Sequence, residues 1–367
     1  METPHLPSIS VMFKQLAETI IARSTRGVGF LVVKDDTEGN KAQEIKASTY
    51  KSLKEEYTAG NAQYIKDMLD AGIYKLFVIK MNGEDTIDDV WKTITGLYSS
   101  GRIVLADGTE AEYKELVDIA KLQNKYHVVT YKLTGSDCMY VENFMTEKVT
   151  FADDRGEVEG IKFLPALAAI LCICNINRSA TYYVCDLLSS CQEAGKSEDE
   201  INEVVGKGNI VLINDVYNGV NSVRIGEGVN TMTTTKDEYH TADMKYIDIV
   251  EAMDLIREDI VQTFKASFVG GKKNGTDNQM LFFAAVNGYF RKLCKPENGE
   301  VLEATYNNIA EIDVNEQRKA WETEKPEAAE WDDNKVRNMP YHRDVFALAD
   351  IKINGAMENL KMKINMN

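Results

Sequence analysis

The stretch Gly29-Phe30-Leu31-Val32-Val33-Lys34 places apolar side chains on both faces of any strand that it forms. A strand with one solvated face alternates apolar and polar residues, so this run predicts a strand that is covered on both sides. Similar short runs occur at residues 74–80, 102–106 and 127–133. Strands of this kind are typical of a mostly parallel sheet covered by helices.

Helix-like segments separate these strands. Residues 61–70 carry apolar side chains on one side, and Asp85 begins a second segment of this kind. Thr109 and Glu112 fit the S/T-x-x-E pattern, in which the two side chains cap the backbone of a helix start. The same pattern predicts a helix over residues 197–205. The alternation of strands and helices therefore predicts an α/β body.

The pattern changes after Thr235. Residues 243–268 predict one long amphipathic helix and residues 277–293 a second, with a glycine-rich loop between them. Two helices joined in this way usually pack as a hairpin. The expected fold is α/β (α+β), with a parallel-type sheet, a C-terminal helical-hairpin/β domain and extended terminal β arms. The expected parts are an N-terminal arm (1–25), the α/β body (26–235), the C-terminal domain (236–345) and a β-hairpin arm (346–367).

Both ends of the chain read as strands with no obvious partner. Apolar side chains recur with a period of two, the pattern of a half-buried strand. They are Ile9, Val11 and Phe13 at the front, and Ile351, Ile353, Leu360, Met362 and Ile364 at the back. Terminal strands fray unless they pair with an edge, and that edge can belong to another copy of the chain. The termini therefore predict a self-assembling subunit.

The composition argues against several classes of protein. The 367 residues include 42 basic and 58 acidic residues, a formal charge of −16, which argues against a nucleic-acid-binding surface. The start of the chain lacks a basic segment followed by an apolar one, so we expect no secretory signal. The longest apolar run, residues 163–173, is shorter than the roughly 20 residues that span a bilayer, and a buried helix is expected. The six cysteines are expected to be buried free thiols of a reducing cytoplasm.

No motif for chemistry stands out. The four histidines are far apart, and neither H-E-x-x-H nor G-x-S-x-G occurs. The glycine-rich residues 270–276 lie between helices and lack the G-x-x-x-x-G-K-[ST] spacing of a phosphate loop. Neighbouring aspartates at 153–154 and 332–333 are better read as solvated loops than as cation sites. We therefore expect no catalytic, cofactor-binding or metal-binding residues, no cofactor and no enzyme activity. An α/β enzyme with an unrecognised small-molecule site is the alternative.

Seven segments, taken in order, carry a resemblance to a known family. They are residues 6–13, 26–35, 177–182, 226–233, 250–260, 277–287 and 349–364. Together they resemble the tail sheath protein of contractile bacteriophages, in the short form found in defective prophages and phage-tail-like bacteriocins of Gram-positive bacteria.

The resemblance implies a structural protein. Sheath subunits form six-fold rings that stack helically around a rigid tail tube, and their terminal arms add strands to sheets of neighbouring subunits. A baseplate signal triggers contraction, which drives the tube into the target envelope. The implied partners are further copies of the chain, the tube protein, and baseplate and tail terminator proteins, without nucleic acid or membrane insertion. The implied location is a virion or phage-tail-like particle assembled in the host bacterial cytoplasm.

The resemblance also assigns residues. The arm contacts between subunits carry over to Ile9, Val11, Phe13, Ile351, Ile353, Leu360, Met362 and Ile364. A polar helix late in the C-terminal domain, residues 315–322, is the candidate for contact with the tube through Arg318 and Lys319. A face that only meets solvent is the equally weighted alternative for this helix.

Overall fold

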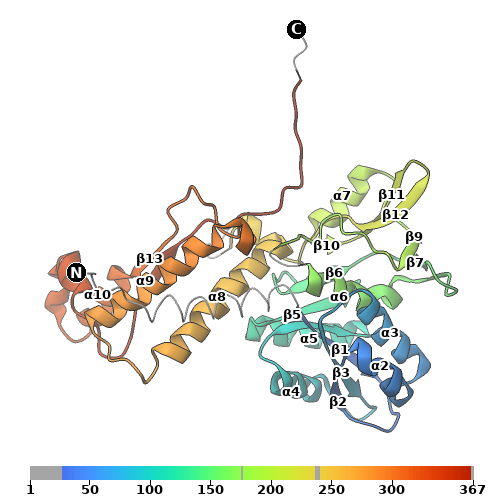
Figure 1. Ribbon diagram of the computed structural model, residues 1–367, viewed down its shortest axis with the longest axis horizontal. Helices are drawn as coiled ribbons and strands as arrows, with labels where there is room; N and C mark the ends of the chain where they lie inside the picture. Colours follow the sequence, from blue (N-terminus) through green and yellow to red (C-terminus); the bar gives the residue numbers. More distant parts are fainter. Residues whose placement is uncertain (1–26, 175–176, 236–239, 365–367) are drawn as a thin grey trace, which may run out of the picture. The chain divides into compact units, whose positions relative to one another are not determined.

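The computed structural model describes residues 27–174, 177–235 and 240–364 (Figure 1). They divide into two compact units. Residues 27–251 and 356–364 form the first, here called the body, and residues 252–355 form the second, the C-terminal unit.

The body is built on a seven-stranded sheet with the order β10-β6-β5-β4-β1-β3-β2. Its strands are β1 (Val28–Lys34), β2 (Ala42–Ile45), β3 (Lys75–Met81), β4 (Gly101–Leu105), β5 (Tyr126–Tyr131), β6 (Val141–Phe144) and β10 (Asn209–Ile210). All neighbouring pairs are parallel except β2 with β3. The central β1 aligns Phe30 with Phe77 of β3 and with Ile103 of β4, and Phe30 to Val33 are almost completely buried. The predicted parallel sheet is confirmed.

Helices cover this sheet, as the blue, cyan and green ribbons of Figure 1 show. They are α2 (Ala47–Leu53), α3 (Ala59–Asp70), α4 (Ile87–Leu97), α5 (Glu110–Gln123) and α6 (Leu164–Ile173), while α7 (Glu198–Gly206) contacts the edge strand β10. Both predicted capping boxes form: Thr109 accepts a hydrogen bond from the Glu112 N–H, and Ser197 accepts one from the Glu200 N–H. The apolar α6 packs against β1, β4 and α3, and it is buried over almost its whole length, as expected for residues 163–173.

Two smaller sheets complete the body. One joins β7 (Lys148–Phe151), β8 (Glu157–Glu159) and β9 (Leu188–Cys191), and the other is the hairpin β11 (Leu212–Tyr217) with β12 (Val220–Ile225). Asn218 and Gly219 at its tip both have positive φ, as a tight two-residue hairpin turn requires. The apolar stretch at residues 210–214 is divided between two sheets, because β10 ends at Ile210 and β11 runs from Leu212 in another sheet.

Four charged or titratable side chains meet beneath α6. Arg102 of β4 is buried and contacts Glu142 of β6 at 2.9 Å and Glu251 of α8 (Ile247–Ser267) at 2.8 Å. His127 of β5 places Nδ1 2.7 Å from Glu142, and the Arg102 guanidinium also donates to the Leu171 carbonyl at the end of α6. Burial alone would raise the pKa of Glu142, but Arg102 and His127 hold it below its ordinary value. The cluster joins three strands and two helices.

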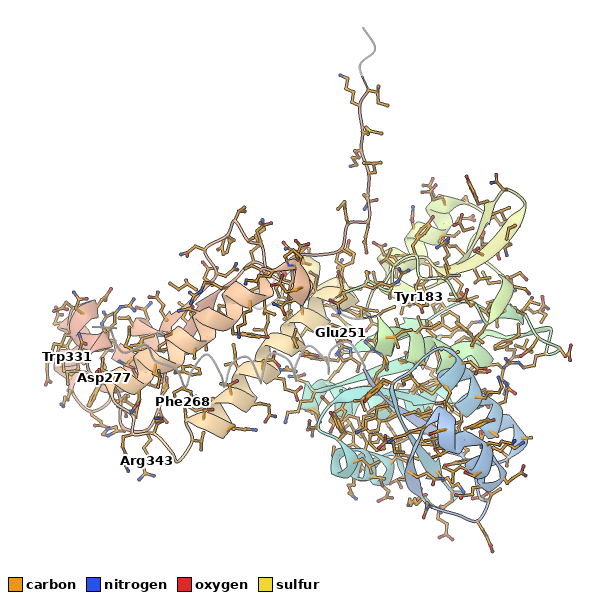
Figure 2. The ribbon with its side chains drawn as sticks, in the orientation of Figure 1. Tyr183, Glu251, Phe268, Asp277, Trp331 and Arg343 are labelled. Atoms are coloured by element: carbon orange, nitrogen blue, oxygen red, sulfur yellow. The ribbon has the colours of Figure 1, made fainter. Side chains whose placement is uncertain are left out.

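The C-terminal unit begins within α8, at Ala252, and contains α9 (Thr276–Leu293). Phe268 and Asp277 flank the loop between the two helices (Figure 2). Phe282 of α9 packs against Phe264 of α8 and Phe268 just after it, with ring centroids 5.2 and 5.3 Å apart, and the Tyr289 hydroxyl donates to Asp259 at 2.5 Å. The predicted helical hairpin is confirmed.

A two-stranded antiparallel sheet, β13 (Ile309–Ile312) with β14 (Ala347–Asp350), follows α9. The chain between these strands folds into a small lobe with α10 (Val314–Glu322) and α11 (Asp333–Arg337). Trp321 and Trp331 form the centre of its core, and the Trp321 indole N–H donates to the Met339 carbonyl at 2.8 Å. Short 3-10 turns occur at Lys54–Glu56, Gly160–Phe163, Ala242–Lys245, Pro296–Asn298 and Pro326–Glu330.

Candidate assembly interface

The C-terminal segment after Gly355 forms neither helix nor strand up to Ile364 (Figure 2). Its apolar side chains are among the most exposed of the described chain: Leu360 is 84%, Met362 69% and Ile364 73% exposed. The β-hairpin expected over residues 346–367 is not formed within the described residues. Its first part joins β13 instead, and its second part has no strand to pair with. We call residues 356–364 the C-terminal arm.

The root of the C-terminal arm is held by the body. The Ala356 N–H donates to Asp248 at 3.0 Å, and the Ser179 hydroxyl donates to Glu358 at 3.3 Å. Burial raises the pKa of Glu227, and the negative charge of Glu358 raises it further. No hydrogen bond of the described residues reaches beyond Glu358 to residues 359–364. The arm is therefore anchored at its root and unpaired in its outer part.

The β13–β14 sheet has an open edge on β14. Hydrogen-bonded and non-bonded pairs alternate in an antiparallel ladder. The Asp313 N–H donates to the Phe346 carbonyl, and the Glu303 N–H donates to the Lys352 carbonyl, so residues 346, 348, 350 and 352 face their own unit. The backbone groups of the residues between them face outward, and the described ranges contain no hydrogen-bond partner for them. They are Ala347, Ala349, Ile351 and Ile353.

The predicted arm contacts fall into three groups. Ile9, Val11 and Phe13 lie outside the described residues. Ile351 and Ile353 are half-buried in the C-terminal unit, where Ile353 bridges to Leu302, so they belong to the open edge and not to the free arm. Leu360, Met362 and Ile364 lie in the exposed arm. Their roles between subunits stay a prediction.

Sequence reasoning missed the strand Ala347–Asp350 itself. Ala347-Leu348-Ala349-Asp350 lacks the apolar alternation of a half-buried strand, because all four residues are exposed. These residues form a strand edge through their backbone N–H and C=O groups. A pattern of side chains does not indicate whether such an edge is free. Only the alternation at Ile351 and Ile353 indicated a strand nearby.

Arg318 and Lys319 lie on α10, which confirms the expected helix. Lys319 is 67% exposed and pairs with Glu316, one turn before it, at 2.6 Å. Arg318 is less accessible, because its guanidinium is bonded to Asp333 at the start of α11 and is 20% exposed. The two cations therefore differ: Arg318 links α10 to α11, and Lys319 is presented on the surface of the lobe.

The carboxyl edge of the main sheet, where α/β enzymes usually bind ligands, carries two ion pairs within the chain. Lys34 contacts Glu112 at 2.7 Å and Lys162 contacts Asp107 at 2.8 Å. Within the described residues no group of three or more His, Cys, Asp or Glu side chains is placed to hold a metal ion. All six cysteines are free thiols, and burial raises the pKa of Cys172 and Cys174 to about 12. A thiol with such a pKa is a poor nucleophile at neutral pH.

None of the helices in the described part of the chain is long and apolar enough to cross a membrane. The long helices α8 and α9 carry charged residues along their length and bury one side in their own hairpin.

The comparisons with known proteins agree with this architecture. Residues 240–367 match the family described as the phage tail sheath C-terminal domain. This part of the chain is similar to that domain. Over 98% of its length the chain is also 24% identical to the tail sheath protein of the Clostridium phage phiCD119, and the match covers 99% of that relative.

Solved sheath structures share the fold at lower identity. The sheath tail protein from Listeria innocua superposes with a TM-score of 0.66 at 12% identity, covering 94% of this chain and 99% of the other. The helical sheath of the anti-feeding prophage, in its contracted state, gives a TM-score of 0.64 at 11% identity, covering 95% and 96%. The resemblance inferred from the seven segments is therefore confirmed, and the fold of both units is that of sheath proteins.

Proposed function

We propose that this chain is a structural subunit of a contractile tail sheath, and that it polymerises into stacked six-fold rings by exchanging strands with neighbouring copies. One observation carries the proposal: among the described residues, the strand edge at 347–353 is open and the arm at 359–364 is unpaired. An extended segment that adds to an exposed edge gains main-chain hydrogen bonds, and its alternate side chains fix the register. The arm's Leu360, Met362 and Ile364 supply that alternation.

The strength of such a polymer comes from repetition. The four outward residues of the edge offer four N–H and four C=O groups. At roughly 1 kcal/mol net for each hydrogen bond, a single added strand stabilises a contact by only several kcal/mol. Many weak arms in one lattice act together by multivalency and make the polymer persistent. An arm anchored only at its root also lets whole subunits rotate without losing the connection, which contraction requires.

The same proposal names the partners and the place of action. The sheath surrounds a tail tube, is bounded by baseplate and terminator proteins, and on contraction drives the tube through a target envelope. Subunits assemble in the host bacterial cytoplasm and function in a virion or phage-tail-like particle. No catalytic step is assigned to the chain, in keeping with the self-paired carboxyl edge of its sheet.

Truncation of the arms tests the proposal. Deletion of residues 356–367, and separately of residues 1–20, is expected to leave a folded, soluble subunit that forms no long tubes in negative-stain electron microscopy. A triple change of Leu360, Met362 and Ile364 to Ser should act like the first deletion. The matched control, Lys361→Gln with Lys363→Gln, keeps the apolar alternation and should assemble. Tubes of normal length from both truncations would overturn the proposal.

We also propose that α10 contacts the tube, and Lys319 is the residue to change first. Its ammonium group is exposed, whereas reversal of Arg318 would also break the ion pair with Asp333. Lys319→Glu should lower the fraction of sheath that co-sediments with tube, and Lys319→Glu with Arg318→Glu should lower it further. Unchanged co-sedimentation of both variants removes α10 as the contact.

A further inference from the structure

The β13–β14 sheet has a second edge, on the outer side of β13, and Asn287 of α9 lies against it. The Ala310 N–H donates to the Asn287 side-chain oxygen at 2.7 Å, and the Asn287 amide nitrogen donates to the Ala310 carbonyl at 3.0 Å. Figure 1 shows α9 and β13 side by side, and the two elements are in contact. One side chain therefore satisfies both backbone groups of the strand residue that faces it.

This arrangement imitates a paired strand. Ala310 forms a non-bonded pair with Ala349, so its N–H and C=O point away from β14. A side-chain amide carries one acceptor and a donor group, as a peptide unit does, and here it engages Ala310 as a neighbouring strand would. Ala310 is buried, in contrast to Ala349, which lies in the same register but is exposed on the open side.

The two edges of the sheet thus differ in kind. On the β14 side, the outward backbone groups of Ala347, Ala349, Ile351 and Ile353 have no hydrogen-bond partner among the described residues, whereas on β13 those of Ala310 are bonded to Asn287. Proteins prevent unwanted strand pairing by covering or blocking sheet edges. A sheet open on both sides would accept strands from two directions and would join polymers laterally.

We propose that Asn287 is the positioning residue that makes strand addition one-sided, by closing the β13 edge so that added strands pair only along Ala347–Ile353. The inference rests on the proposed function, since it specifies where that exchange occurs. The added strand comes from a second copy of this chain, whose arm pairs with β14 and does not pair with β13.

The test compares Asn287→Ala with a matched control on the same helix. Asn278→Ala removes a half-buried asparagine that donates to the Lys273 carbonyl in the loop before the helix, far along the chain from β13, so it should behave as the parent protein. Asn287→Ala is expected to convert single tubes into laterally joined bundles in electron micrographs. Single tubes indistinguishable from those of the parent would overturn the inference, and if the arm deletions still abolished tubes, the proposed function would stand without it.

Hydrogen exchange provides a readout that a loss of packing alone would not give. The Ala310 amide is expected to be protected in the parent subunit before assembly. In Asn287→Ala it should exchange freely in the subunit and regain protection in the bundles, where a strand pairs with β13. An Ala310 amide that stays protected in the unassembled variant would contradict the proposal.

A second variant covers the case in which Asn287→Ala folds poorly. Ala310→Pro combined with Asn287→Ala closes the same edge differently, because proline has no N–H and does not accept a strand on that side. Single tubes should return in the double variant if Asn287 acts by closing the edge. Failure of the double variant to restore them, with bundles or amorphous material persisting, would count against the inference.

Discussion

At the scale of single residues, the most consequential side chain of the body is Arg102. It is buried in the sheet and is bonded to Glu142, Glu251 and the Leu171 carbonyl. Neighbouring groups in this cluster come from residues up to 149 positions apart in the chain, so no local sequence pattern marks it. The apolar run at residues 102–106 predicted a strand, but it did not indicate that the strand begins with a buried ion pair.

Arg102→Met is expected to destabilise the subunit by about 3–5 kcal/mol, because it leaves the fully buried Glu142 without its main counter-charge. Urea denaturation of the unassembled subunit would measure the change. Adding Glu142→Leu should recover most of the loss, since an apolar pair of similar volume avoids the buried charge. Glu251 tolerates the loss of the Arg102 charge better than Glu142 does, because a quarter of the Glu251 side chain is exposed to water. A single variant as stable as the parent protein would contradict the role given to Arg102.

At the scale of elements, sequence patterns predicted what depends on local chemistry. The continuous apolar runs gave the parallel strands β1, β3, β4 and β5, and the capping boxes at Thr109 and Ser197 gave two helix starts. The short strands β6 to β9 were missed, since three or four residues are too few to show a period. The open edge of β14 was missed for a different reason: it is a property of backbone groups and of which neighbour is absent, which no residue type encodes.

The alternation of backbone directions on β14 yields a sharp prediction for two adjacent prolines. Ala349 points its N–H outward, so Ala349→Pro should leave the β13–β14 ladder intact while blocking the edge to an added strand. Leu348→Pro removes an N–H that faces Glu311 within the ladder and should destabilise the subunit itself. The unfolding temperature of the subunit should therefore fall only in the Leu348 variant, whereas tube formation should be lost in both variants.

The contrast between the two prolines separates edge pairing from general damage. Both residues are exposed, so neither change opens a cavity in a core. If Ala349→Pro assembled into normal tubes, the β14 edge would not be where strands are added. If it unfolded at the same temperature as Leu348→Pro, the assignment of outward and inward groups would be wrong.

At the scale of the whole molecule, the charge of −16 opposes self-association, because every copy repels the next. The contacts proposed here are main-chain hydrogen bonds and apolar side chains, which salt does not screen. The repulsion, by contrast, falls as the Debye length shrinks from about 10 Å at 0.1 M salt to about 3 Å at 1 M. Added salt should therefore weaken the charge repulsion that opposes assembly and leave unchanged the hydrogen bonds and apolar contacts that drive it.

The expected result is a lower critical concentration for tube formation as sodium chloride is raised from about 0.05 M to about 0.5 M, since this range takes the screening length well below the size of a subunit. Light scattering across a dilution series would measure it, with the unfolding temperature of the unassembled subunit as the control for any effect of salt on the fold. An interface held by ion pairs would respond in the opposite direction, because screening weakens attraction between opposite charges as well. Tubes that dissolve as salt rises would therefore exclude strand exchange as the main contact and would direct attention to the charged faces of the body.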